Sequence, residues 1–177
     1  MSQRAIVGPY VYFVTTNTTN REIFFVAQEQ AVLLGRIIQN ACRLKNFDLF
    51  GYCILPNHIH LLVHNRNAPQ RGFRNPRCGA EKEYTLSHLM HAIKRNFSRQ
   101  QPNSGRLWQP RFNFRIIDNE PRFFNTMEYI KYNYRKMNLP EMYGRHPWVW
   151  IDHKKIDQFF NDHHIPSTTR GLKAARG

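Results

Sequence analysis

With 177 residues, 41% of them hydrophobic, the chain is long enough for one compact domain with a packed core. Its three cysteines form no CxxC pair, and no apolar run approaches the roughly 18 residues of a membrane span, which argues against a disulfide scaffold, a cysteine-based zinc site and a membrane protein. The 26 Lys and Arg residues against 12 Asp and Glu give a formal net charge of +14, which favours a polyanionic partner because neutralising phosphates releases counterions.

The predicted secondary structure follows from apolar periodicity: alternation or β-branched runs for strands, and apolar residues three or four apart for helices. In chain order we expect a strand at 10–16, a helix at 27–43, strands at 48–55 and 58–64, a helix at 86–99, a strand at 112–117 and a helix at 120–137. This order matches the ferredoxin-like split βαβ plan. The predicted fold class is α+β, an antiparallel sheet with helices on one face plus a C-terminal helix.

We expect one domain over residues 1–150 and a C-terminal extension over 151–177 that is largely basic and partly disordered. The domain contains a basic loop at 65–83, longer than ordinary connections and therefore either functional or disordered. A phosphate-gripping role is one interpretation of this loop and plain disorder is the other. Its candidate DNA contacts are Arg66, Arg71, Arg74 and Arg77.

Two histidines in the strand at 58–64 are the first candidate site. His58 and His60 are two residues apart, so in a strand they share one face, while Ile59, between them, points to the other face. Two imidazoles on rigid backbone form half of a metal site. The alternative is a half-buried strand with two exposed histidines. His64 shares their face but lies too far along the strand, and we expect it to be a surface residue or a DNA contact.

The helix at 120–137 supplies a second set of polar groups. Its apolar stripe is predicted to be buried and consists of Phe123, Met127, Ile130 and Tyr134. Tyr129, Asn133 and Lys136 form a column beside that stripe, which places a phenol, an amide oxygen and a cation together. A phenol near a divalent cation could attack a phosphodiester. The alternative for Tyr129 is an ordinary tyrosine at a helix–sheet boundary.

Further candidate DNA contacts are cationic or aromatic, because a basic protein rich in aromatic residues can grip the backbone and stack unpaired bases of a single strand. For Trp108, packing in the core is the competing interpretation. These candidates are Lys94, Arg95, Trp108, Arg111 and Lys136.

Four short motifs resemble one known family. Residues 55–63 read LPNHIHLLV, 107–112 read LWQPRF, 128–133 read EYIKYN and 146–148 read HPW. In order and spacing they resemble the single-tyrosine HUH transposases, especially the REP-associated tyrosine transposases, over roughly residues 8 to 150. The resemblance implies the same ferredoxin-like fold.

The resemblance also implies roles. His58 and His60 would bind Mg²⁺ or Mn²⁺ with Asn133 as a further ligand, and Tyr129 would be the nucleophile. The expected reaction cleaves single-stranded DNA beside a hairpin, forms a 5′-phosphotyrosine, frees a 3′-hydroxyl and rejoins DNA. Relatives include monomers and dimers, so either a monomer or a homodimer is expected.

Two positions depart from the family pattern. Tyr134 stands where relatives usually carry Pro, so the helix is expected to run longer, and Phe114 replaces an acidic residue. A catalytically silent protein of this fold that binds structured DNA or RNA is therefore the main alternative. A zinc hydrolase using the two histidines is weaker, because the chain has no HExxH motif.

Overall fold

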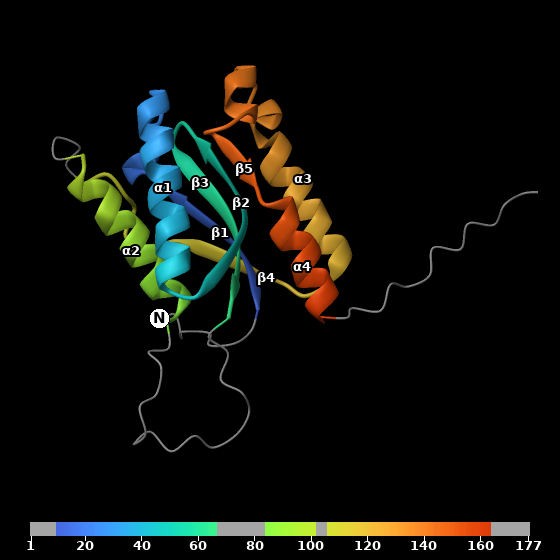
Figure 1. Ribbon diagram of the computed structural model, residues 1–177. Helices are drawn as coiled ribbons and strands as arrows, with labels where there is room; N and C mark the ends of the chain where they lie inside the picture. The colour runs from blue at the N-terminus through green and yellow to red at the C-terminus, as the bar shows by residue number, and fades with distance from the viewer. Residues whose placement is uncertain (1–9, 67–83, 102–105, 164–177) are drawn as a thin grey trace, which may run out of the picture.

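A five-stranded antiparallel sheet lies between two layers of helices (Figure 1). The computed structural model describes residues 10–66, 84–101 and 106–163. The strands occur in the order β4-β1-β3-β2-β5 across the sheet. Their bounds are Val11–Asn17 for β1, Phe47–Leu55 for β2, His58–Asn65 for β3, Asn113–Ile117 for β4 and Val149–Ile151 for β5.

Helices α1 and α2 cover one face of the sheet, and α3 and α4 lie on the other (Figure 1). Their bounds are Gln28–Leu44 for α1, Leu86–Arg99 for α2, Glu120–Lys136 for α3 and His153–His163 for α4; short 3₁₀ turns are η1, Thr19–Arg21, and η3, Glu141–Gly144. The first four strands and two helices follow the split βαβ plan, which confirms the predicted fold class.

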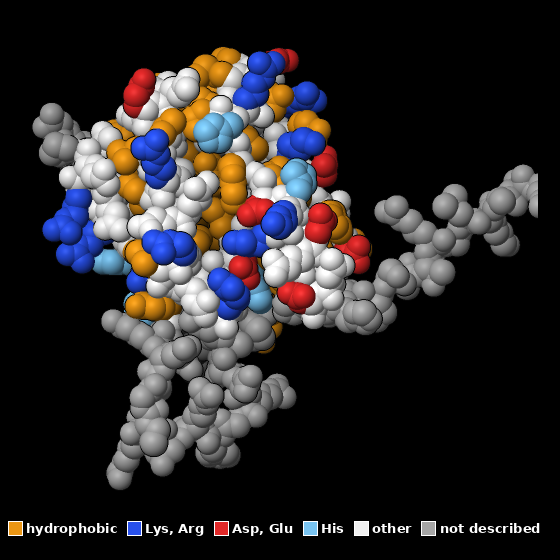
Figure 2. All heavy atoms as spheres, in the orientation of Figure 1, with side chains coloured by type: hydrophobic (Ala, Val, Ile, Leu, Met, Phe, Trp, Pro, Cys, Tyr) orange, Lys and Arg blue, Asp and Glu red, His pale blue; other side chains and the backbone are white. Residues whose placement is uncertain are grey.

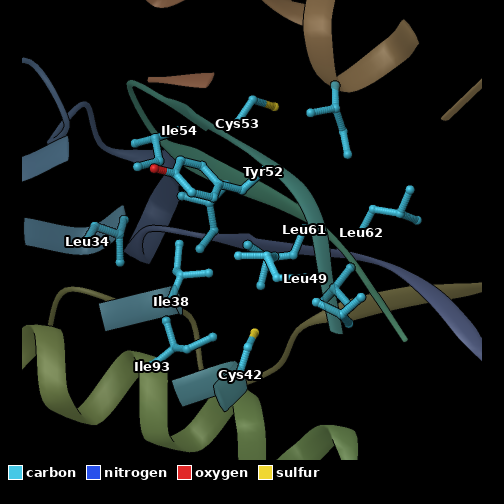
Figure 3. Packing of buried hydrophobic residues seen from close by; sticks show 14 of the residues in the cluster. Leu34, Ile38, Cys42, Leu49, Tyr52, Cys53, Ile54, Leu61, Leu62 and Ile93 are labelled. Carbon is cyan, nitrogen blue, oxygen red and sulfur yellow. The ribbon is translucent and has the colours of Figure 1, made fainter. Parts of the chain in front are cut away.

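The main core fills the space between the sheet and the pair α1–α2. Leu34 and Ile38 from α1 and Ile93 from α2 face Tyr52 and Leu61 from the strands, and all five are buried (Figure 3). Alternation along β2 turns the next side chain after Tyr52 to the opposite face of the sheet. Ile59, Leu61 and Val63, which alternate with the histidines of β3, belong to this core, as the sequence predicted.

Two elements were not predicted, one at the edge of the sheet and one on its opposite face. Strand β5 pairs with β2, and α4 places Phe159 and Phe160 against Phe123 of α3, with ring centroids 6.2 and 5.0 Å away. All of α4 falls within the stretch expected to be a basic extension, but its apolar residues pack on α3 and β2. Residues 164–177 lie outside the described residues. In the described part of the chain, no helix is long and apolar enough to cross a membrane.

Charge alone does not locate a nucleic-acid interface on the face seen in Figure 2. Lys and Arg side chains are spread over this face in separate groups, and several Asp and Glu side chains lie among them toward α4. A binding site therefore has to be identified from the geometry of particular residues.

Candidate active site

The histidines of β3 lie on the sheet face that α3 covers. Thr15 of β1 and Cys53 of β2 flank His60 in the register, so the three side chains form a row across the sheet. His58 belongs to the next row, and the two imidazole rings are 4.8 Å apart between centroids. The predicted shared face is confirmed. The alternative of two exposed histidines is wrong, because His60 is only 4% exposed and His58 is half-buried.

Burial keeps both imidazoles neutral. Desolvation, with a smaller contribution from the charge of Arg21, lowers the pKa of His58 to about 4. Desolvation and the neighbouring His58 lower the pKa of His60 to about 3. A neutral imidazole retains a lone pair on one ring nitrogen, and this is the form that binds metals. At neutral pH the pair is therefore ready to act as two ligands without losing protons.

Each histidine has a polar partner at Nδ1. The Thr15 hydroxyl lies 2.8 Å from Nδ1 of His60, and the Asn57 side-chain oxygen lies 2.6 Å from Nδ1 of His58. Nε2 of His60 is buried and has no hydrogen-bond partner among the described residues. Most buried polar atoms have a partner, and an unpartnered Nε2 in this position fits a nitrogen that binds a ligand.

Tyr129 of α3 lies directly against this row. Its ring centroid is 5.3 Å from that of His60 and 5.7 Å from that of Phe13, and Phe13 itself stacks on His60 at 5.0 Å. The helix is anchored by Asn119, whose side chain accepts a hydrogen bond from the backbone N–H of Arg122. The predicted stripe of α3, Phe123, Met127, Ile130 and Tyr134, is buried against the fold and so orients Tyr129 toward the sheet.

Asn133 and Lys136 extend this arrangement along α3. Asn133 is 3% exposed, and its amide lies beside the thiol of Cys53, the cross-strand neighbour of His60. Burial raises the pKa of that thiol to about 12, so Cys53 stays protonated and is not a nucleophile here. The ammonium of Lys136 is 4.8 Å from the centre of the Tyr129 ring. The column predicted from helix geometry is thus present.

The side chains around His58 and His60 supply some of the ligands that a divalent cation needs. Among residues 10–66, 84–101 and 106–163, no group of three His, Cys, Asp or Glu side chains gathers as a metal site. A histidine pair with a buried, unpartnered Nε2 still fits a cation whose other ligands are an amide oxygen, phosphate or water. Among the described side-chain amides, Asn133 best fits the role of the amide ligand. This pattern does not favour the zinc hydrolase, which requires a third strong ligand.

A hollow of about 1120 Å³ opens beside Tyr129 and His60 toward β4. Arg115 of β4 and Arg122 of α3 line it, the latter paired at 2.9 Å with Asp118. Sequence reasoning missed both arginines. The position of Arg115 could have been found from strand alternation, because it lies in the same row as Phe13. A hollow with cationic walls beside a phenol can hold a phosphodiester strand.

A second hollow, of about 470 Å³, lies next to α2. Arg95 and Arg106 are exposed at its edge. Lys94 is less available than predicted, because its ammonium donates hydrogen bonds to the backbone oxygens of Gln109 and Arg111, at 2.7 and 3.1 Å, and burial lowers its pKa to about 8. The Lys94 ammonium therefore mainly holds residues 109–111 against α2.

Trp108 was a predicted DNA contact, but it lies in the core. The side chain is only 7% exposed, and its ring packs 5.5 Å from Phe25 and 6.0 Å from Phe97. An indole that is buried to this extent leaves no open face on which a base could stack. The core-packing interpretation is the one that the structure supports.

The remaining predicted DNA contacts do not gather at one site. Arg111 and Lys136 are exposed. Arg66 is exposed with Nε 3.5 Å from Asp48, and His64 is buried rather than on the surface, with its ring 4.9 Å from Phe159 of α4. The predicted contacts Arg71, Arg74 and Arg77 lie outside the described residues.

Two comparisons with known proteins find relatives, whereas no protein-family model matches the chain. A Haemophilus influenzae protein provisionally named a REP-associated tyrosine transposase is 27% identical over 111 residues, or 62% of this chain. The match also covers 62% of that relative, so the chain spans about three fifths of the length of the curated protein that it matches.

Among solved structures, a REP-associated tyrosine transposase bound to a REP hairpin aligns with a TM-score of 0.64 and 22% identity, over 90% of this chain and 86% of that one. At this identity the likeness shows the fold. Together with the sequence match, it confirms the resemblance predicted from the four motifs: in sequence and in fold, this chain is similar to the REP-associated tyrosine transposases.

Proposed function

We propose that this protein is a metal-dependent endonuclease and strand transferase that cleaves single-stranded DNA near hairpins. The observation that carries the proposal is the contact between Tyr129 and His60, whose Nε2 is buried and has no partner in the part of the chain that the structure describes. A phenol, a pair of neutral imidazoles and a hollow lined by arginines thus meet at one place. The proposed substrate agrees with the net charge of +14.

In the proposed reaction, the Tyr129 oxygen attacks the phosphorus of a phosphodiester. A bond forms between this oxygen and phosphorus, and the bond from phosphorus to the 3′-oxygen breaks. The phenol loses its proton, and the departing 3′-oxygen gains one to become a 3′-hydroxyl. The product is a 5′-phosphotyrosine, which retains the energy of the bond, so the same or another 3′-hydroxyl can reverse the step without ATP.

His58, His60 and Asn133 would hold Mg²⁺ or Mn²⁺. When bound, such a cation acts as a Lewis acid that offsets negative charge on the phosphate. The chain's own groups do the rest. Phe13 fixes the Tyr129 ring against His60, and Lys136 supplies positive charge beside the phenol. Arg115 would hold the DNA backbone in the hollow that leads to the tyrosine.

Recognition of a hairpin is the finer part of the proposal. The solved relative binds a REP hairpin, and the present chain shares its fold. We propose that Arg66, Arg95, Arg111 and the basic loop hold the backbone of a comparable hairpin, with Arg71, Arg74 and Arg77 as its candidate contacts. Arg106, which lines the same hollow as Arg95, joins this set.

The test is a cleavage assay on labelled single-stranded DNA that contains a hairpin, taken from the flanks of the gene. Wild-type protein should nick it with Mg²⁺ or Mn²⁺ and leave it intact in EDTA. His60→Ala should bind the DNA but fail to nick it, whereas His153→Ala, a change at an exposed histidine of α4, should behave like wild type. Tight binding to the hairpin in EDTA with no nicking under any condition would favour the silent binding protein instead.

A further inference from the structure

The side chain of Asn57, in the turn between β2 and β3, is held between two partners. Its Nδ2 donates to the backbone oxygen of Arg21 at 3.2 Å, and its Oδ1 lies 2.6 Å from Nδ1 of His58. A backbone carbonyl oxygen can only accept hydrogen bonds. The contact with Arg21 therefore determines which end of the amide is the NH₂ group, and the oxygen must face His58.

This orientation determines the tautomer of His58. An amide oxygen has no proton to donate, so the contact at 2.6 Å requires the proton to be on Nδ1 of the imidazole. A neutral imidazole carries one N–H, which leaves the lone pair on Nε2.

Backbone hydrogen bonds hold the partner of the Asn57 side-chain amide in place. The backbone N–H of Thr18 donates to the Asn57 carbonyl at 2.9 Å, and the N–H groups of Phe24 and Phe25 donate to the Pro56 carbonyl at 2.7 and 2.9 Å. These bonds fasten the segment after β1 to the β2–β3 turn. The Arg21 carbonyl is thereby kept beside the amide of Asn57.

Thr15 has the corresponding position beside His60. Its hydroxyl, 2.8 Å from Nδ1, could either donate or accept. If it donated, His60 would carry its proton on Nε2, where the described residues offer no acceptor. A buried polar atom without a partner is unfavourable whether it is a donor or an acceptor. If Thr15 instead accepts from Nδ1–H, Nε2 keeps a lone pair, which a bound cation would satisfy.

We propose that Asn57 is a positioning residue that holds the proton of His58 on Nδ1, that Thr15 does the same for His60, and that both histidines thereby present Nε2 to a divalent cation. The part that concerns the cation rests on the proposed function. The tautomer of His60 rests on it too, since a cation would satisfy its Nε2. The tautomer of His58 does not, because it follows from the two contacts of Asn57, and it can be measured on metal-free protein.

The first test is NMR of ¹⁵N-labelled, metal-free protein near pH 7, in which ring nitrogens are correlated with ring protons. Wild type should show His58 and His60 protonated at Nδ1. Asn57→Ala should let His58 populate the Nε2–H form, whereas Asn57→Asp keeps an acceptor and should retain Nδ1–H. A wild-type His58 protonated at Nε2 would overturn the proposal, and this result requires no variant to fold.

The second test is Mn²⁺ binding followed by calorimetry on folded variants. Loss of a partner that orients a ligand typically costs about 10–100-fold in metal affinity. We expect this loss for Asn57→Ala and for Thr15→Val, and near wild-type affinity for Asn57→Asp, Thr15→Ser and the exposed control Asn40→Ala. Equal affinity in wild type and Asn57→Ala would contradict the positioning role. Wild type that binds no Mn²⁺ would refute the metal part of the proposed function, while the NMR result would still decide the tautomers.

Discussion

The ammonium of Lys136 lies 4.8 Å from the centre of the Tyr129 ring, two turns further along α3. The side chain of Lys136 is exposed, so water screens its charge, and we expect about 1 kcal/mol of stabilisation for negative charge that develops on the phenol oxygen.

Lys136→Met should therefore slow formation of the covalent DNA adduct about fivefold to tenfold, as this energy implies. Lys136→Arg should restore most of the rate. The measurement is a single-turnover time course with saturating DNA, which separates the rate from affinity. A Met variant that reacts as fast as wild type would remove Lys136 from the proposed chemistry.

The two histidines should make folding stability depend on pH. Their pKa values are lowered by burial, to about 4 for His58 and about 3 for His60, so the unfolded chain binds more protons below pH ~6.5. The contribution of the two neutral histidines to the free energy of unfolding is therefore complete above that pH. It decreases as the pH falls toward 3, with a slope of up to about 1.4 kcal/mol per pH unit for each histidine.

Urea unfolding between pH 4.5 and 6.5 would measure this slope in a range above most carboxylate titrations. His60→Gln should flatten the dependence, whereas the exposed control His153→Gln should leave it as in wild type. Parallel stability curves for wild type and His60→Gln would mean that His60 is protonated as easily in the folded protein as in the unfolded chain.

Trp108 should contribute to stability rather than to DNA binding. Its indole packs against Phe25 and Phe97 in the core, so Trp108→Ala should cost about 3–5 kcal/mol in the free energy of unfolding. Trp108→Phe keeps an aromatic ring and should cost less. The folded Phe variant should bind single-stranded DNA with wild-type affinity, measured by fluorescence anisotropy. A large loss of affinity in that variant would restore a direct role in binding.

The hollow beside α2 offers a test of electrostatic binding. Arg95→Ala and Arg106→Ala should each weaken DNA binding and reduce the slope of log affinity against log salt by about one, because each removes one phosphate contact. Arg145 is a matched control, because its guanidinium pairs with Glu141 at 3.1 Å. Salt titrations of the three variants would show whether this hollow contacts the backbone. Unchanged slopes in the first two would place the DNA elsewhere.

The sequence was sufficient to predict β1 to β4 and the column on α3, because these follow from local periodicity. Alternation along β3 put the two histidines on one face, and helical spacing put Lys136 near Tyr129. These relationships depend only on the geometry of one element. The burial of Trp108, in contrast, depends on Phe25 and Phe97, which are distant in sequence.

Helix α4 was missed although its signal is present. Ile156, Phe159 and Phe160 have the spacing of one helical face, but the polar residues around them made this stretch look like part of a tail. Because α4 was missed, His64 was placed on the surface, whereas Phe159 covers it. The contacts of Asn57 were equally out of reach, since they require the chain near Arg21 to return to the β2–β3 turn.

The most direct measurement of the central claim is a denaturing gel of protein mixed with labelled hairpin DNA and Mn²⁺, comparing wild type, Tyr129→Phe and Tyr132→Phe. Tyr132 is a half-exposed tyrosine on the same helix, whose ring contacts Lys131 and Arg135. The account predicts a protein-linked DNA band for wild type and Tyr132→Phe, and none for Tyr129→Phe, which should still bind the hairpin. A linked band that persists in Tyr129→Phe, or that disappears in Tyr132→Phe instead, would contradict Tyr129 as the nucleophile.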